Sequence, residues 1–184
     1  MSHDNHKDAQ QVLDFWYGLN PAQWFKNDTD LDNQIRGQFF EIWQQAAAGE
    51  LSLWRNTLEG RLAEIIVLDQ FSRNLFRGQA RAFARDEMAL VLSQEALRHD
   101  DYSELSKDRA KFLIMPFMHS ESKVIQAQSV KLFKNLGDKN SLDFAEQHKA
   151  IIDQFGRYPH RNQALGREST AQEKEFLKQP GSSF

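Results

Sequence analysis

The chain has 184 residues, with 40% apolar residues, 27% charged residues and a net charge of −3, which is ordinary for a globular protein. It contains no cysteine, which excludes disulfides, thiolate catalysis and metal sites built on cysteine. Dedicated nucleic-acid-binding proteins usually carry a basic field, so we do not expect nucleic acid as a partner.

The start of the chain, MSHDNHKDAQQ, is polar and lacks the apolar segment of a signal peptide. The most apolar stretch, residues 62–68, is interrupted by Glu64 and is much shorter than a membrane span. We therefore expect a cytoplasmic protein with no membrane partner.

Apolar residues recur with the spacing of an α-helix through most of the chain. In residues 32–49, Ile35, Phe39 and Trp43 fall on one helical face, and Gly49 follows as a stop. The same spacing predicts further helices, in residues 58–76, 82–100, 108–119, 123–137 and 141–156. Stretches that alternate apolar and polar residues between turn signals, as strands do, are missing.

Helix boundaries carry their own signals. Pro116 is expected to kink or end the helix of residues 108–119, and Thr170 with Glu173 forms a capping box that opens a short last helix. We predict an all-α protein, an αα-hairpin array of about seven or eight helices without a strict sequence repeat. We expect one domain over residues 1–184, with loose tails at 1–7 and 179–184.

The segment NDTDLDN, residues 27–33, imitates the start of a calcium loop through Asp28, Asp30 and Asp32. Such a loop needs Gly at its sixth position and Glu at its twelfth, where this chain has Asn33 and Phe39. We interpret the segment as an N-cap and an acidic first turn for the helix that follows.

Two windows without acidic residues hold seven of the twelve arginines. Residues 70–85 contain four of them, Arg73, Arg77, Arg81 and Arg85, and residues 154–167 contain three, Arg157, Arg161 and Arg167. The guanidinium group is a fixed fork of donors that suits carboxylate or phosphate. If the windows meet in space, they predict an anionic partner, a small molecule or a peptide.

A structural interpretation of the same arginines stays open. Asp69 and Arg73 are four residues apart, so they can pair on one helix face. Gly156 suits a left-handed helix cap, Arg157 suits the negative end of the helix dipole, and Pro159 prevents the helix from continuing.

Histidines and carboxylates near the second window offer acid–base chemistry. His119 is followed by Glu121, but residues two apart on a helix do not face each other, so the pairing needs a turn or another carboxylate such as Asp69. His148 lies within a helix, where we favour a buried, hydrogen-bonded role over a catalytic one. No tight metal-binding spacing occurs, and we expect neither a metal nor a cofactor.

Several motifs together resemble the domain of unknown function 924 family. They are VLDFWYG at 12–18, WF at 24–25, LDQFSRNLFRG at 68–78, AFARD at 82–86, HSE at 119–121 and FGRYPHRNQALGREST at 155–170. The resemblance implies an all-helical, tetratricopeptide-like superhelical fold and implies no activity. It carries signature polar residues to Asp69, Gln70, Arg73, Asn74, Arg77, His119, Glu121, His148, Arg157, His160, Arg161 and Asn162.

Three functional hypotheses follow. In the leading one, the 69–78 and 155–162 motifs form a pocket for an anionic small molecule, with binding residues Arg73, Asn74, Arg77, Arg157, His160, Arg161 and Asn162. Tyr17, Trp24 and Phe25 are expected as the walls of this pocket.

In the second hypothesis, the same cleft belongs to a hydrolase or transferase, with catalytic candidates His119, His148, Asp69 and Glu121. In the third, the protein is a peptide-binding module with exposed Phe and Trp in an open groove.

Overall fold

The computed structural model describes residues 5–183, and every regular element within this range is helical. The α-helices are α1 (Asn5–Gly18), α2 (Thr29–Ala47), α3 (Leu58–Ile66), α4 (Ser72–Leu75), α5 (Asp86–Ala96), α6 (Lys107–His119), α7 (Lys123–Leu136), α8 (Lys139–Phe155) and α9 (Ala171–Phe176). Because α3 and α4 form one continuous rod, the described residues contain eight helical units, and the predicted all-helical array is confirmed.

Shorter helical turns connect or interrupt these helices. The 3₁₀ turns are η1 (Pro21–Gln23), η2 (Ser52–Asn56), η4 (Ala80–Ala82), η5 (Asp100–Glu104) and η6 (Pro159–Arg161), and η3 (Val67–Phe71) is a π-helical turn between α3 and α4. None of the helices between residues 5 and 183 has the length and apolar character needed to cross a membrane.

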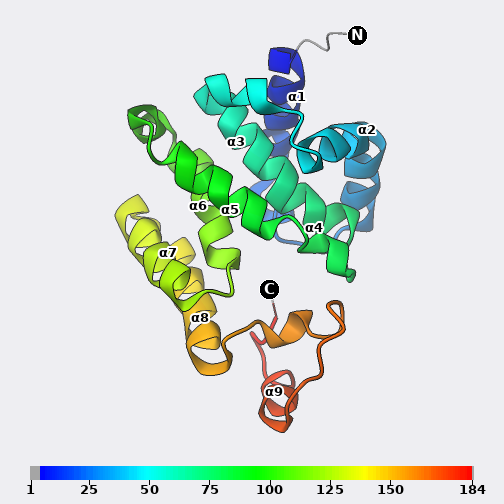
Figure 1. The fold of residues 1–184 in the computed structure, drawn as a ribbon, viewed down its shortest axis with the longest axis vertical. Coiled ribbons are helices and arrows are strands. Elements are labelled where there is room, and N and C mark those ends of the chain that lie inside the picture. The colour runs from blue at the N-terminus through cyan, green and yellow to red at the C-terminus, as the bar shows by residue number, and fades with distance from the viewer. Residues whose placement is uncertain (1–4, 184) are drawn as a thin grey trace.

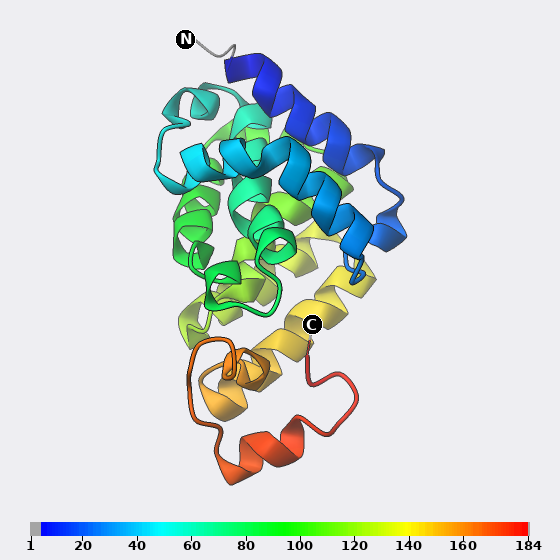
Figure 2. The same cartoon turned by 90° about the vertical axis from the view of Figure 1, so that its right-hand side faces the viewer.

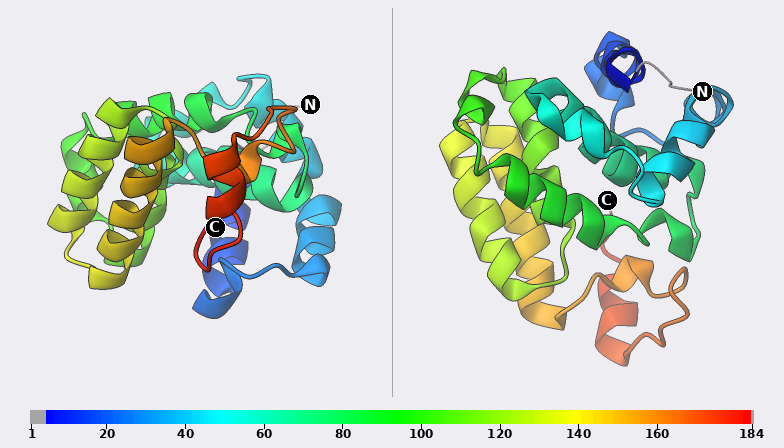
Figure 3. Two further views of the ribbon diagram at one scale, coloured as in Figure 1. Left: turned by 90° about the horizontal axis from the view of Figure 1, so that it is seen from below. Right: turned by 45° about the horizontal axis from the view of Figure 1, so that its top comes forward.

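The helices pack mostly against neighbours in the chain. The α3 helix runs through the middle and contacts α1, α5 and α6, while α6, α7 and α8 pack side by side (Figure 1). The segment after α8 returns as a loop with η6 and α9 at the end of the molecule opposite α1 (Figure 2). Seen from below, this C-terminal segment lies beside α8 (Figure 3).

Aromatic side chains fill the core. The largest fully buried ones include Trp16, Trp43, Trp54 and Phe71, all in one cluster that extends from α1 to α8. A second, small cluster forms where α8 meets the C-terminal segment, around Ile152 and Tyr158. The C-terminal segment therefore has little apolar contact of its own, and polar groups must contribute to holding it.

Most of the predicted helix boundaries are confirmed. The Asp28 side chain caps α2 by accepting hydrogen bonds from the backbone of Asp30 and Leu31. Gly156 ends α8 with a left-handed φ of 71°, and Thr170 and Glu173 form the capping box of α9. Pro116 does not end α6, which continues to His119.

The predicted loose tails lie partly outside the described residues. Residues 1–4 and 184 are not described, and α1 already begins at Asn5, inside the segment where a tail was expected.

Candidate functional site

The site begins at the π turn η3, whose five residues, Val67–Phe71, are all buried. A π turn holds one residue more than an α turn, and such turns are frequent at functional sites. Here the turn places the carboxylate of Asp69 inside the protein, with only 1% of the residue exposed. The amide of Gln70 donates a hydrogen bond to Asp69 Oδ2 at 2.7 Å.

His119, the last residue of α6, meets Asp69. Its Nδ1 lies 2.6 Å from Asp69 Oδ1. The partner of His119 is thus the more distant carboxylate and not its neighbour in sequence, Glu121. A buried carboxylate on Nδ1 fixes the orientation of the ring and leaves Nε2 for other contacts.

Burial and charge set the ionisation of this pair. Burial alone would raise the pKa of Asp69, but the charges of His119 and Arg73 and the hydrogen bonds from His119 and Gln70 hold that pKa below its ordinary value. Burial lowers the pKa of His119, helped by the positive charge of Arg73 and opposed by Asp69. At neutral pH the pair is therefore an ionised Asp69 and a neutral His119 that donates from Nδ1.

Asp86, the first residue of α5, joins the two arginine windows. Arg73 donates to both of its carboxylate oxygens at 3.0 Å and lies 3.1 Å from Asp69 Oδ1. Arg161 donates to Asp86 Oδ2 at 3.1 Å and to the backbone oxygen of His119 at 3.0 Å. Through these bonds, Arg73 of α4, Asp86 of α5, His119 of α6 and Arg161 of the C-terminal segment form one connected polar cluster.

Arg161 is held between two aromatic rings. Its guanidinium carbon lies 4.6 Å from the ring centre of Phe83 and 4.5 Å from that of Tyr158. Only 7% of the side chain is exposed, and its buried Nε has no hydrogen-bond partner among the described residues. A buried N–H without an acceptor is unfavourable and is a signal for a bound molecule or water.

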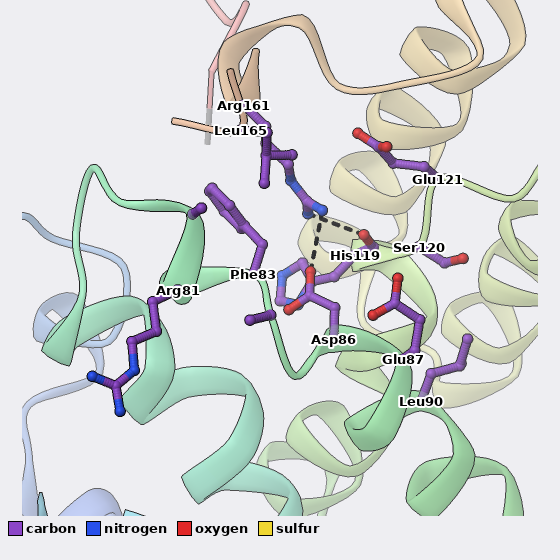
Figure 4. A pocket seen from close by; sticks show the side chains of 12 residues that line it. Arg81, Phe83, Asp86, Glu87, Leu90, His119, Ser120, Glu121, Arg161 and Leu165 are labelled. Carbon is purple, nitrogen blue, oxygen red and sulfur yellow. Dashed lines mark hydrogen bonds and ion pairs between the residues drawn. The ribbon is translucent and has the colours of Figure 1, made fainter. Parts of the chain in front are cut away.

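A pocket of about 560 Å³ opens beside these groups. Its lining includes Phe83, Asp86, Glu87, His119, Ser120, Glu121 and Arg161. In Figure 4, Arg161 reaches down from the C-terminal segment, and dashed lines mark its bonds to Asp86 and His119. Arg81 also lines the pocket, but its side chain points away and lies 4.3 Å over the ring of Phe76.

Glu121 fastens the C-terminal segment at the rim of this pocket. Arg167 donates to its two carboxylate oxygens at 2.6 Å and 2.9 Å, and the backbone N–H of Tyr158 donates at 2.8 Å. Although burial opposes it, these bonds hold the pKa of Glu121 below its usual value. Glu121 therefore positions the segment that carries Arg161.

Other predicted binding residues lie away from the pocket. Asn74 and Arg77 both bind Asp32 of α2, with Arg77 donating at 2.8 Å and 2.9 Å. The structure thus brings together Arg73 and Arg161 but leaves Arg77 in an ion pair elsewhere.

The remaining polar residues of the second motif hold the C-terminal segment. Arg157 donates to both carboxylate oxygens of Glu173 at 2.6 Å and 2.8 Å, and Asn162 also donates to Glu173. Arg157 and Asn162 therefore tie the loop to α9.

Two further histidines, His148 and His160, lie near the site without lining the pocket. His148 is 5% exposed, and its Nδ1 lies 2.8 Å from the backbone oxygen of Phe144, as expected for a buried, hydrogen-bonded residue. Its ring centre is 6.4 Å from that of His119. Burial is the main cause that lowers the pKa of His148 to about 3 and that of His160 to about 4.

The predicted aromatic walls were wrong. Tyr17, Trp24 and Phe25 gather around the ring of Phe112, at 5.0 to 6.1 Å between ring centres, and none of them lines the pocket. Within residues 5–183, no three His, Asp or Glu side chains are grouped so that they could hold a metal ion.

The family is decided by comparison with known proteins. The model of the family described as bacterial protein of unknown function (DUF924) matches residues 12–181. The chain belongs to the DUF924 family. Its fold is similar to that of a protein of unknown function from Agrobacterium tumefaciens, with a TM-score of 0.91 and 36% identity over 95% of this chain and 99% of that one. A comparison with curated protein sequences finds no match.

The most important residue that the sequence did not single out in this DUF924 protein is Asp86. It follows directly on the acid-free window of residues 70–85, and the motif AFARD ends on it. One signal in the sequence could have indicated Asp86: a window rich in arginine needs a counter-ion, and Asp86 is the first acidic residue after it. Phe83 and Tyr158, which enclose Arg161, carried no signal beyond their positions in the motifs.

Proposed function

We propose that this DUF924 protein is an enzyme that uses His119 as a general base. The observation that carries this proposal is that His119 binds a buried, ionised Asp69 through Nδ1 and at the same time lines the pocket. A histidine that is oriented by a carboxylate on one nitrogen and that lines a void suits general-base catalysis.

In the proposed reaction, neutral His119 takes a proton through Nε2 from a water or a substrate group in the pocket. The imidazolium that forms is stabilised by Asp69, which remains ionised. Arg161, fixed between two rings, stabilises the negative charge that develops on the substrate. The reaction class is hydrolysis or group transfer.

The two other hypotheses have less support. Binding of an anionic molecule would draw on Arg73, Arg77, Arg157 and Arg161. Arg77 and Arg157 are in ion pairs elsewhere, and Arg73 is paired with both Asp69 and Asp86, so of these four only Arg161 lines the pocket. A peptide-binding groove was expected to expose both Phe and Trp. Phe25 and Phe144 are exposed, but all four tryptophans are buried.

The test compares hydrolysis by the wild type, His119→Gln and Asp69→Asn on a panel of small ester, anilide and phosphate substrates. Loss of a general base lowers kcat/KM by about 10²- to 10⁴-fold, so we expect His119→Gln to fall into that range. The matched control is His99→Gln. His99 is exposed and directly precedes η5, so this variant should keep wild-type rates. Absence of turnover on the whole panel, or equal rates in His119→Gln, would contradict the proposal.

A further inference from the structure

We infer that Gln70 is a positioning residue for the proposed base His119: its side-chain amide holds the second oxygen of Asp69, so that the first oxygen stays on His119 Nδ1. The inference rests on the proposed function, because it concerns how the same histidine is kept ready to accept a proton. Gln70 does not line the pocket, so it acts through Asp69 and not on the substrate.

The two carboxylate oxygens of Asp69 have separate partners. Oδ1 lies 2.6 Å from His119 Nδ1 and 3.1 Å from Arg73 Nη1. Oδ2 accepts a hydrogen bond from Gln70 Nε2 at 2.7 Å, and no other hydrogen bond within residues 5–183 reaches it. A buried carboxylate oxygen needs a donor, and Gln70 supplies it.

The Gln70 side chain is itself fixed in place. It is buried, and its Nε2 also lies 3.2 Å from the sulfur of Met115 in α6. A side-chain amide carries two N–H groups, so it has one for each partner. An amide oxygen in this position would repel the ionised Asp69, so the nitrogen faces the carboxylate.

Arg73 cannot replace Gln70 in this role. It donates to both carboxylate oxygens of Asp86, and its contact with the Asp69 carboxylate is at Oδ1, the oxygen that already faces the imidazole. Without Gln70, Oδ2 would be buried with no donor, which is unfavourable. Asp69 would relieve this by turning about its Cβ–Cγ bond, and its contact with His119 Nδ1 would weaken.

The contact at Nδ1 decides which nitrogen of His119 is free. When Asp69 accepts from Nδ1–H, Nε2 carries no proton and can take one from a water or a substrate group. If the contact opens, the other neutral form of the ring becomes populated, with its proton on Nε2, and this form cannot act as a base there. Gln70 therefore keeps His119 in the form that general-base catalysis needs.

The ionisation of Asp69 supports the same role. Burial raises the pKa of Asp69, and the hydrogen bond from Gln70 adds to the charges of His119 and Arg73 that bring this pKa below its ordinary value. An ionised Asp69 is the group that stabilises the imidazolium after His119 takes a proton.

The test measures the Nδ1 proton of His119 by ¹H–¹⁵N NMR. Gln70→Met removes the amide and keeps the length of the side chain, and Gln70→Leu is a second variant without a donor. We expect exchange of the Nδ1 proton with water to accelerate about tenfold or more, the effect of one hydrogen bond to a charged group. The ring ¹⁵N signals should then show the form protonated at Nε2. Backbone amides of α6 should keep wild-type rates, because the Gln70 amide bonds only side chains.

The matched control is Ser93→Ala. The Ser93 hydroxyl donates to the backbone oxygen of Leu113 in α6, so this variant also loses a buried hydrogen bond to α6 but leaves Asp69 untouched. Exchange of the His119 Nδ1 proton in Ser93→Ala should match that of the wild type.

A second measurement needs no variant of Gln70. In the wild type, one Nε2 proton of Gln70 should shift together with the His119 ring signals as acid protonates the ring, since both side chains contact the same carboxylate. On a substrate that the protein turns over, Gln70→Met should lower kcat about tenfold to hundredfold and leave KM unchanged, because Gln70 lies outside the pocket.

Wild-type exchange of the Nδ1 proton in folded Gln70→Met or Gln70→Leu would overturn the inference, and so would a Gln70 amide that does not respond when His119 is protonated. Equal acceleration in Ser93→Ala would also overturn it, because the effect would then be a general loss of stability. The proposed function fails differently. In that case the Nδ1 proton responds to Gln70→Met as expected, but the wild type and His119→Gln hydrolyse the substrate panel at equal rates.

Discussion

At the scale of single residues, Asp86 links Arg73 and Arg161, which come from distant parts of the chain. The sequence indicated both arginines and also Asp69 and His119, because charged groups and imidazoles in apolar helical segments are conspicuous. It did not indicate that Asp86 pairs with both arginines. That pairing depends on how α5 lies against α4 and the C-terminal segment, which no local pattern encodes.

We therefore predict that Asp86→Asn lowers the free energy of unfolding by about 3 to 5 kcal/mol, since it removes a buried carboxylate and leaves Arg161 without a counter-ion. Chemical denaturation at neutral pH measures the change. Asp153→Asn removes an exposed carboxylate paired with Lys149 and serves as the control, with a change of about 0 to 1 kcal/mol. Equal effects of the two substitutions would show that the Asp86 cluster is not a stabilising centre.

His148 gives a pH dependence of stability. Its pKa is lowered to about 3 by burial, against roughly 6.5 in an unfolded chain. The unfolded state therefore binds the proton more tightly, and stability is lost as the pH falls from about 6.5 toward 3. One such group costs about 2 kcal/mol at pH 5 relative to pH 8.

Replacing His148 with Phe should remove about that amount from the difference in unfolding free energy between pH 8 and pH 5, while keeping a ring beside Tyr158. Denaturation curves at the two pH values measure it. Phe144→Leu, on the same helix and half exposed, should keep the full difference. An identical pH dependence in wild type and His148→Phe would refute this origin.

At the scale of elements, the sequence predicted most helix ends but not the π turn. Gly156, the Thr170 capping box and the acidic first turn of α2 are local features, and each signal acts within a few residues. The π turn η3 lies in a stretch, residues 58–76, whose apolar spacing reads as one regular helix. Asp69, within this turn, pairs with His119, which is 50 residues away in the chain, and local periodicity does not contain such a partner.

The start of α3 contains a close approach that only glycine permits. A Cβ on Gly60 would lie 1.9 Å from the backbone oxygen of Trp54. Gly60→Ala should therefore destabilise the protein by about 3 kcal/mol or more, as strong overpacking does. Gly37→Ala, within α2 and with no atom near its added Cβ, should instead stabilise by about 0.5 to 1 kcal/mol.

Thermal and chemical denaturation of both glycine variants check the pair. A Gly60→Ala protein as stable as wild type would mean that η2 can move away from α3 without cost. A destabilised Gly37→Ala protein would show that the exposed face of α2 has a packing role that the structure does not contain.

At the scale of the whole molecule, the C-terminal segment completes the site. It supplies Arg161 to the pocket, but its own apolar cluster is small. Its attachment depends on polar bonds, among them the pair of Arg167 with Glu121. The sequence showed that these groups were present, but helix packing decides which of them meet, and so the partners of Arg77 and Arg157 were not predicted.

Arg167→Met should loosen this segment without unfolding the large core. Hydrogen bonds to a charged group contribute about 1.5 to 3 kcal/mol, so amide hydrogen exchange in residues 157–176 should accelerate about tenfold or more. Exchange in α1 and α3 should stay at wild-type rates. The control is Arg98→Met. Arg98 is exposed and lies just after the end of α5, so this substitution should change exchange in neither region.

If exchange instead accelerated equally throughout the molecule, the C-terminal segment would be part of the same cooperative unit as the core. A wild-type exchange pattern in Arg167→Met would show that the small cluster around Ile152 and Tyr158 is sufficient to hold the segment.

The π turn also determines which kinds of sequence change the site can tolerate. Each residue of an α-helix advances the chain by about 100° around the axis. A π turn uses one residue more for about the same rotation, so losing one residue from Val67–Phe71 would restore a regular helix and leave the direction of α4 nearly unchanged. The remaining side chains of the turn would be redistributed around the helix axis, and we expect the contact of Asp69 with His119 to be lost. During divergence of this family, single-residue deletions here are expected to be more damaging than most substitutions.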